Sequence, residues 1–409
     1  MTRPVVVVGA GLGGLVAAAR LAQRGKKVLL LEGLDRLGGV SGEWQCDGAT
    51  YVRGSVEFMG GFYRGLERIG LHLPIHPVRS RYYFGNRTLT LPPRLQELPF
   101  LARALPGTLV AARALGRSAD GNLTEALVGR SQATRTFLAC FLQQGGLRFS
   151  DVQAADARGM VTHAWEDGMH QPALVEGGPQ RAVDALADRC RKSGVEIRVG
   201  EEVLRVQPGR VETRSGPIEV EAVLSSRPRW QEWRGPSAPG LALGQVLLWV
   251  SEMPQFPDKL DTIYRLPADV DAWHAALSAG RWPTELGWSL VNPRLGPEPE
   301  RRTLVGYLPV PAGAGPEGIL ERLLAEMERL VPGLNRQIRA ARLLLPEEYR
   351  ALHGLDPVPV PRVPLGASRR PSYQNADTGE LHMGTSVEPP SLYGASVVRR
   401  ALTIAEELP

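Results

Sequence analysis

The segment from Val5 to Gly14 reads VVVVGAGLGG, and it decides the fold of this chain. A short β-branched run of this kind is typical of a strand buried on both faces of a parallel sheet. The glycines that follow it fit the spacing GxGxxG at Gly9, Gly11 and Gly14. In that spacing the first glycine permits a tight turn, the second lets the backbone approach a pyrophosphate, and the third lets a helix lie close to the strand. The segment therefore predicts a dinucleotide-binding turn, which Leu12 and Gly13 also border.

The residues that follow complete a strand–helix–strand unit. Leu15–Arg24 is alanine-rich and predicts a helix, whose positively polarised amino terminus suits a pyrophosphate. Val28–Leu31 predicts the second strand, and Glu32 stands at its carboxyl end, where an acid can accept hydrogen bonds from a ribose. An acid at this position disfavours the 2′-phosphate of NADP. The expected fold class is therefore α/β, with a Rossmann-like domain built on a parallel sheet.

Length and composition limit the other possibilities. A chain of 409 residues exceeds the usual size of one hydrophobic core, so we expect two domains. Lysine and arginine outnumber aspartate and glutamate by 48 to 43, but no dense basic run occurs, so we expect no nucleic-acid partner. A basic face held against anionic lipid fits this mild excess at least as well. The oligomeric state is left open.

The cysteines and the apolar runs indicate the cellular compartment of the protein. Cys46, Cys140 and Cys190 stand far apart and fit neither a disulfide framework nor a metal site, which suits a reducing cytoplasm. No uninterrupted charge-free run reaches the roughly 18 residues that span a bilayer. We therefore expect a cytoplasmic protein without a metal ion and without a membrane-crossing segment.

The residues after Glu32 read GLDRLGGVS and extend the nucleotide motif. This extension resembles the second glycine motif of FAD-dependent oxidases and desaturases of the amine oxidase and phytoene desaturase superfamily. The resemblance implies that these residues lie along the ribityl chain and pyrophosphate of FAD, and NAD-only Rossmann domains lack them, so FAD is the expected cofactor. Many members have arginine where this chain has Val40. The matching positions here are Gly33, Arg36, Gly38 and Gly39.

Three later segments match the same superfamily in order. The strand and turn ending at Gly54-Ser55 would bring backbone against the isoalloxazine, although this dipeptide is equally typical of an ordinary turn. Val203 would hold the adenine through its backbone, whereas by periodicity alone it is a core valine. In the closing segment Thr385 stands where the family has aspartate, and a last helix would aim its N–H groups at the flavin. The closing positions are Gly384, Thr385, Tyr393, Gly394 and Ala395.

These segments divide the chain. The resemblance implies an FAD-binding domain assembled from residues 1–85, 166–235 and 363–409. An inserted α+β substrate domain would be formed by residues 86–165, which look mainly helical, and 236–362, which contain strand-like runs.

The leading hypothesis for function is an FAD-dependent oxidoreductase that transfers hydride between flavin N5 and a lipophilic substrate. Desaturation of an isoprenoid or polyene is favoured, with oxygen or a quinone as electron acceptor. A flavin amine or protoporphyrinogen-type oxidase is the alternative, although none of the four lysines matches the lysine that amine oxidases place near the flavin. A non-enzymatic prenyl-lipid carrier of the same fold is an alternative of another class. Such carriers lack the intact nucleotide site that this chain keeps.

Two further hypotheses concern single segments. His170 precedes the predicted turn at Gly177-Gly178 and is the candidate catalytic proton carrier, although a packed or solvated histidine is the commoner state. Leu89–Leu115 mixes leucine, phenylalanine and proline with Arg94, Arg103 and Arg113. This mixture suggests peripheral attachment to a membrane surface, against the commoner alternative of surface helices packed on a core.

Overall fold

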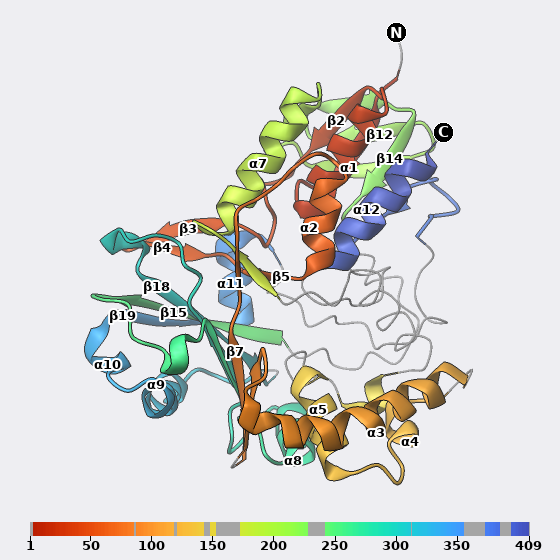
Figure 1. The fold of residues 1–409 in the computed structure, drawn as a ribbon. Coiled ribbons are helices and arrows are strands. Elements are labelled where there is room, and N and C mark those ends of the chain that lie inside the picture. The colour runs from red at the N-terminus through yellow and green to blue at the C-terminus, as the bar shows by residue number, and fades with distance from the viewer. Residues whose placement is uncertain are drawn as a thin grey trace.

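The computed structural model describes residues 3–85, 87–117, 121–142, 148–152, 172–227, 242–311, 313–355, 373–384 and 394–408. Two large sheets organise these residues (Figure 1). One is a five-stranded sheet near the two termini, and the other is a seven-stranded sheet that several small helices surround.

The five-stranded sheet is parallel throughout, in the order β10-β2-β1-β14-β20. Its central strand is the valine run, whose residues are at most 6% exposed. Burial on both faces explains why this strand is apolar at every position instead of alternating. The strands are β1 (Val5–Val8), β2 (Val28–Leu31), β10 (Glu196–Arg198), β14 (Ala222–Ser225) and β20 (Leu381–His382).

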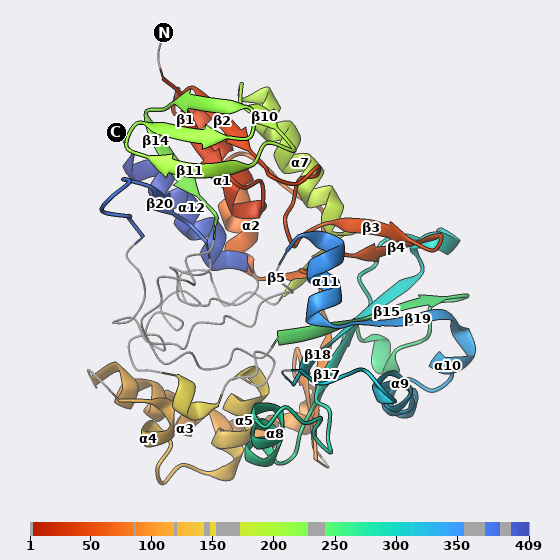
Figure 2. The same cartoon turned by 180° about the vertical axis from the view of Figure 1, so that it is seen from behind.

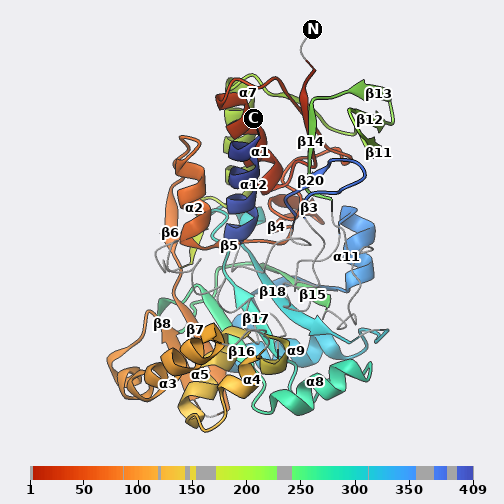
Figure 3. The same ribbon diagram turned by 90° about the vertical axis from the view of Figure 1, so that its right-hand side faces the viewer.

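Helices cover one face of this sheet and an antiparallel meander covers the other (Figure 2). The first helix packs on both α7 and α12, and α12 also packs on α2. An ion pair of 3.0 Å between Arg20 and Glu406 joins the first and last helices, which lie side by side in Figure 3. The helices are α1 (Leu12–Gln23), α2 (Gly60–Glu67), α7 (Pro179–Lys192) and α12 (Ala395–Glu407), and the meander is β11 (Val203–Gln207), β12 (Arg210–Thr213) and β13 (Gly216–Glu219).

The seven-stranded sheet is mixed, in the order β19-β15-β18-β17-β16-β7-β8. All its pairs are antiparallel except that of β16 with β7. Helix α9 packs its apolar face on this sheet through Leu323 and Met327. The strands are β7 (Ser80–Phe84), β8 (Arg87–Leu91), β15 (Ala242–Val250), β16 (Thr262–Leu266), β17 (Trp288–Val291), β18 (Thr303–Val310) and β19 (Ile338–Leu344), and the neighbouring helices are α8 (Val270–Ser278), α9 (Ile319–Leu330), α10 (Leu334–Gln337) and α11 (Pro346–His353).

Strand β7 differs from the expected domain division. It pairs with β16 and β8, so the chain enters the seven-stranded sheet at Ser80 and not after residue 85. Gly85 lies in the turn between β7 and β8 and so does not mark the change of sheet, because the boundary is set by pairing with a strand far along the chain. The remaining boundaries stay predictions.

A layer of helices lies beyond the edge strand β8 of the larger sheet (Figure 3). Its longest member, α3, contacts α5 through the small residues Ala104 and Gly107, both of which meet Thr134. A Cβ on Gly107 would stand 2.2 Å from the Thr134 hydroxyl, so this approach requires glycine. The layer consists of α3 (Leu98–Arg117), α4 (Leu123–Ala126) and α5 (Gln132–Leu142).

Short strands connect the two large sheets. One hairpin consists of β3 (Glu43–Cys46) and β4 (Ala49–Val52). A second small sheet has the order β5-β9-β6, formed by β5 (Glu57–Phe58), β9 (Ala173–Val175) and β6 (Ile75–Pro77).

Candidate functional site

Two glycine-rich turns meet at the carboxyl edge of the parallel sheet. The Gly38 N–H donates a 2.8 Å hydrogen bond to the Ala10 carbonyl, and Gly38 forms a parallel bridge with Gly11. Gly38 and Gly39 have φ values of 99° and 58°, in the left-handed region that glycine tolerates best. The structure therefore brings together the two motifs that the sequence places about 25 residues apart.

The glycines of the first turn have different tasks. A Cβ on Gly14 would stand 1.9 Å from the Gly9 carbonyl oxygen, and a Cβ on Gly9 would stand 2.0 Å from the Ser226 hydroxyl. A Cβ on Gly13 would stand 2.6 Å from Val397 on α12, so this glycine serves helix packing. A Cβ on Gly11 would meet nothing within 4 Å. Gly11 alone among these four faces open space, as the residue beside a pyrophosphate should.

Glu32 is anchored beside this turn. Its side chain is buried, with one carboxylate oxygen accepting the Ala10 N–H at 2.7 Å and the other accepting the Leu34 N–H at 2.9 Å. Each oxygen keeps acceptor capacity, because a carboxylate offers about four lone-pair sites. A Cβ on Gly33 would stand 3.7 Å from Glu202, which is an ordinary van der Waals distance. The acid is thus fixed where the adenosine ribose of a dinucleotide would lie.

Arg53 is a buried cation behind the second turn. It is 3% exposed and donates to the carbonyls of Gly39 at 2.8 Å and Glu43 at 2.9 Å. No carboxylate of the described residues lies within ion-pair distance of it, and its Nε has no hydrogen-bond partner there. A buried charge without a counterion is costly, and an anionic ligand would offset that cost. The donor set therefore fits the pyrophosphate of a dinucleotide.

Arg36 adds to the positive charge at this place. It donates to the His353 carbonyl at the end of α11 and pairs with Asp35 at 3.1 Å. Burial lowers the pKa of Arg53, and the positive charge of Arg36 lowers it further. Burial, together with both arginines, also lowers the pKa of His353 to about 4. Sequence reasoning missed Arg53 as a site residue, although an arginine directly after the apolar strand at 49–52 is a visible signal.

The predicted flavin-side turn is also held against the second glycine motif. The Ser55 N–H donates to the Val40 carbonyl at 3.1 Å, and Ser41 bridges Ser55. From the seven-stranded sheet, the Tyr307 hydroxyl donates to the Gly54 carbonyl, and Gln245 donates to the carbonyl of Arg53 at 3.2 Å. Hydrogen bonds therefore hold this turn between the second glycine motif and the seven-stranded sheet.

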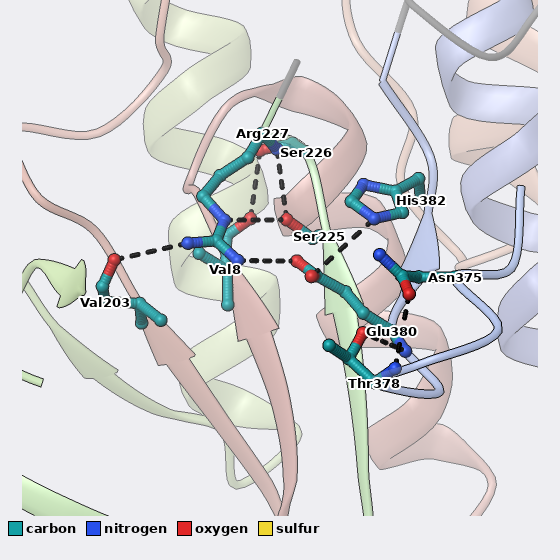
Figure 4. Close-up of polar contacts among 9 residues, drawn as sticks. All are labelled: Val8, Val203, Ser225, Ser226, Arg227, Asn375, Thr378, Glu380 and His382. Carbon is teal, nitrogen blue, oxygen red and sulfur yellow. Dashed lines mark hydrogen bonds and ion pairs between the residues drawn. The ribbon is translucent and has the colours of Figure 1, made fainter. Parts of the chain in front are cut away.

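The closing segment returns to the same edge. Gly384 leaves room for the Ser226 carbonyl, from which a Cβ would be 3.0 Å away. Gly394, with φ of 79°, precedes α12, whose first turn starts at Ala395 and has no side-chain cap. The helix therefore begins without a capping side chain at Gly394. Val203 is buried at the start of β11, and Figure 4 shows it beside the end of β1. Thr385, Tyr393 and His170 lie outside the described residues.

The remaining reactive side chains do not form a metal or thiol site in the described part of the chain. No group of three histidine, cysteine, aspartate or glutamate side chains there could hold a metal ion. All three cysteines are free thiols, and burial raises the pKa of both Cys140 and Cys190 to about 12. These thiols are therefore protonated at neutral pH and poor nucleophiles.

The different surroundings of Gly11 and Gly14 give a matched test of the nucleotide turn. Gly11→Ala should leave the free energy of unfolding nearly unchanged, because φ of −66° suits alanine and its Cβ meets no neighbour, but it should weaken FAD binding about tenfold or more. Gly14→Ala should instead lower stability by on the order of 1–3 kcal/mol, since its Cβ overlaps the Gly9 carbonyl. Thermal denaturation and flavin-fluorescence titration measure the two effects. If Gly11→Ala bound FAD as tightly as wild type, the assignment of Gly11 as the residue beside the pyrophosphate would be wrong.

His353 predicts a pH dependence of stability. The unfolded chain binds a proton near pH 6.5, whereas the folded chain resists it until about 4, so stability should fall as pH drops from 6.5 towards 4. The loss between pH 7 and 5 should be on the order of 1–2 kcal/mol. His353→Phe keeps a ring between Trp44 and Tyr349, so denaturant titrations should show a smaller loss in this variant than in wild type. Equal losses in both proteins would contradict the assignment.

Comparisons with known proteins agree with this geometry. A family model described as an NAD(P)-binding Rossmann-like domain matches residues 7–68. Prolycopene isomerase of Daucus carota is 38% identical over 87 residues, which are 19% of this chain and 14% of that protein. The 15-cis-phytoene desaturase of Solanum lycopersicum is 37% identical over 70 residues, or 17% of this chain and 12% of that protein. The similarity in sequence thus covers only a small part of these relatives' length.

Solved structures resemble the chain over its whole length. An oxidoreductase from Methanosarcina mazei has a TM-score of 0.68 at 16% identity and covers 99% of this chain and 100% of its own. Putrescine oxidase bound to putrescine has a TM-score of 0.68 at 15% identity, with 100% and 99% covered. The predicted likeness to desaturases and amine oxidases is confirmed, the first by sequence and the second by fold. The chain contains a Rossmann-like nucleotide-binding domain within the α/β fold that putrescine oxidase shares, as the sequence predicted.

Proposed function

We propose that this protein is an FAD-dependent oxidoreductase that takes hydride from a lipophilic substrate, with carbon–carbon desaturation of an isoprenoid or polyene as its reaction. The observation that carries the proposal is the joined pair of glycine turns backed by Arg53, a buried cation with no carboxylate within ion-pair distance among the described residues. The second turn, at Gly38-Gly39, favours FAD over NAD, because it extends the nucleotide site beyond the Rossmann glycines.

Different residues of the site would hold different parts of the cofactor. Glu32 would accept from the adenosine ribose, and the amino terminus of α1 would face the pyrophosphate together with Arg53. The amino terminus of α12 would stabilise negative charge on the reduced ring. When bound, flavin supplies the hydride acceptor at N5.

The reaction needs two hydrogens to leave neighbouring carbons of the substrate. One would leave as a hydride, for which bound flavin would supply the acceptor, and the other as a proton to a base, with a double bond forming between the carbons. His170 is proposed as the group that accepts the proton. Oxygen or a quinone would be the final electron acceptor.

A buried carboxyl close to the flavin-side turn favours a neutral substrate over an ammonium. Glu57 is 5% exposed, and its two oxygens accept from the hydroxyls of Thr262 and Tyr264. Burial raises the pKa of this carboxyl. The carboxyl is thus engaged by protein donors and biased towards its neutral form. We therefore favour a desaturase over an amine oxidase. The intact nucleotide turn favours either enzyme over a flavin-free lipid carrier.

Spectra and substrate bleaching test the enzyme proposal. Purified protein, or protein reconstituted with FAD, should show the absorption of oxidised flavin, and an apolar polyene should bleach it anaerobically. Putrescine and a protoporphyrinogen serve as the competing substrate classes. Bleaching by an amine alone would replace desaturation with amine oxidation, and a colourless protein that takes up no FAD would leave the lipid-carrier alternative.

We further propose that α3 rests on an anionic membrane surface at the cytoplasmic side. Small residues occupy much of the packed side of α3, where Ala104 and Ala111 are buried and Gly107 meets Thr134 of α5, whereas three of its leucines, Leu98, Leu105 and Leu109, are exposed. Leu105 is 43% exposed and Leu109 is 65% exposed. Soluble amphipathic helices normally bury such residues. The exposed apolar positions are Leu95, Leu98, Leu105, Leu109 and Val110.

The charges around the exposed face of α3 favour an anionic lipid surface over a groove on another protein as its partner. Between Leu98 and Arg117 the helix has no acidic residue, and Arg103, Arg113 and Arg117 are exposed. Arginine beside leucine is the composition of interfacial helices that bind anionic headgroups. Leu95–Leu115 is, by length and composition alone, long and apolar enough to cross a membrane. Because one face of α3 is docked on α5, we propose that it lies along the surface and does not cross.

Vesicle flotation tests this surface. At low salt the wild-type protein should float with vesicles containing phosphatidylserine and much less with phosphatidylcholine alone, since both leucines and arginines contribute. Leu105→Glu with Leu109→Glu should abolish flotation, whereas Leu204→Glu, a control at a leucine that is 60% exposed on β11, should not. A wild-type protein that fails to float with anionic vesicles would refute the proposal.

A further inference from the structure

Arg227 stands where three elements meet at the carboxyl edge of the parallel sheet. It follows β14, whose last residue, Ser225, pairs with Val8 of β1 on one side and His382 of β20 on the other. Figure 4 shows its side chain reaching from β14 past Val8 towards Val203 on the meander. It therefore crosses the end of the central strand, next to the nucleotide turn.

The guanidinium of Arg227 is fixed in place. It donates to Glu380 Oε1 at 2.8 Å, to the Val203 carbonyl at 3.3 Å and to Ser225 Oγ at 3.4 Å. The Glu380 side chain is 5% exposed, and its backbone N–H bonds the Thr378 hydroxyl. The Arg227 side chain itself is 36% exposed. A side chain that is held by three acceptors and still partly accessible is preorganised for a ligand.

Its position coincides with the adenosine end of a dinucleotide. The pyrophosphate belongs at the amino terminus of α1 and the ribose at Glu32, so the adenine must lie within one sugar's length of that acid. The Glu201 N–H donates to the Glu32 carbonyl at 2.9 Å, which places the start of β11 beside it. On the other side, Ser226 donates to the Val8 carbonyl and touches the Gly9 position. The guanidinium lies between these two landmarks.

We propose that Arg227 recognises the adenine of the bound dinucleotide, with Glu380 and Ser225 as the residues that position it. The inference rests on the proposed function in requiring a dinucleotide at this edge. A guanidinium is planar and stacks on aromatic rings, including those of nucleobases. Glu380 already neutralises its charge, so Arg227 offers a flat surface, whereas Arg53 meets the phosphates.

Binding of nucleotide fragments separates adenine recognition from other roles. The full chain, stripped of flavin, is titrated with FAD, with ADP and with FMN, which lacks the adenosine. Arg227→Gln combined with Glu380→Gln removes both members of the pair, so that neither is left buried without the other. This variant should bind FAD and ADP about tenfold more weakly, whereas its FMN affinity should stay within about twofold of wild type. Arg227→Lys keeps the positive charge but loses the planar guanidinium, so it should weaken ADP binding by about the same factor.

Arg205→Gln is the matched control, because it removes an exposed arginine from β11 and should leave all three affinities unchanged. Unaltered FAD and ADP affinity in the paired variant, with only a lower melting temperature, would reduce Arg227 to a structural partner of Glu380. Equal weakening of FMN and FAD would move its action to the phosphates and overturn the proposal. A wild-type chain that binds ADP but no flavin would contradict the proposed enzyme, while the ADP comparison would still decide the role of Arg227.

Discussion

The hydrogen bond from the Gly38 N–H to the Ala10 carbonyl joins the two glycine turns, and the rest of the site depends on it. The two backbones approach closely where no side chain stands between them, since a Cβ on Gly39 would be 3.3 Å from Gly11. Within the second turn, a Cβ on Gly38 would stand 2.3 Å from the Ser41 carbonyl, so this turn also requires glycine. Once the turns are joined, Glu32 and Arg53 are brought to the same edge of the sheet. The glycines thus determine where the charged groups lie.

That arrangement leaves the buried Arg53 without a carboxylate at ion-pair distance among the described residues. Among the described residues Arg53 bonds only carbonyl groups, and Arg36 lies close by. Burial, followed by the charges of these two arginines, lowers the pKa of His353 to about 4, so this histidine is neutral at pH 7. Burying a charge without a partner costs several kcal/mol, roughly, unless a counterion arrives. A pyrophosphate would both neutralise Arg53 and bond the free N–H groups of α1. The same feature that lowers the stability of the free chain therefore supports tight binding of an anionic cofactor.

The local parts of this site could be predicted from sequence, whereas its long-range contacts could not. The valine strand, the following helix and the terminal acid Glu32 each carry a short-range pattern, so the Rossmann-like unit was predictable. The packing of Gly13 on Val397 and the reach of Arg227 to Glu380 join segments more than 150 residues apart, and no local pattern encodes them. The entry of the chain into the second sheet at Ser80 is of the same kind, because it depends on pairing with β16.

The way the two sheets are joined explains why the fold alone does not identify a substrate. Gln245 and Tyr307 of the larger sheet donate to the carbonyls of Val52, Arg53 and Gly54, so the flavin-side turn is held through its backbone. Backbone carbonyls are present whatever side chains the turn carries. The side chains of the seven-stranded sheet can therefore diverge without moving the turn, which agrees with a shared fold at only 15% identity to putrescine oxidase. Glu57 shows the same independence, because its two oxygens accept from the side chains of Thr262 and Tyr264 of the larger sheet and not from the backbone of the turn.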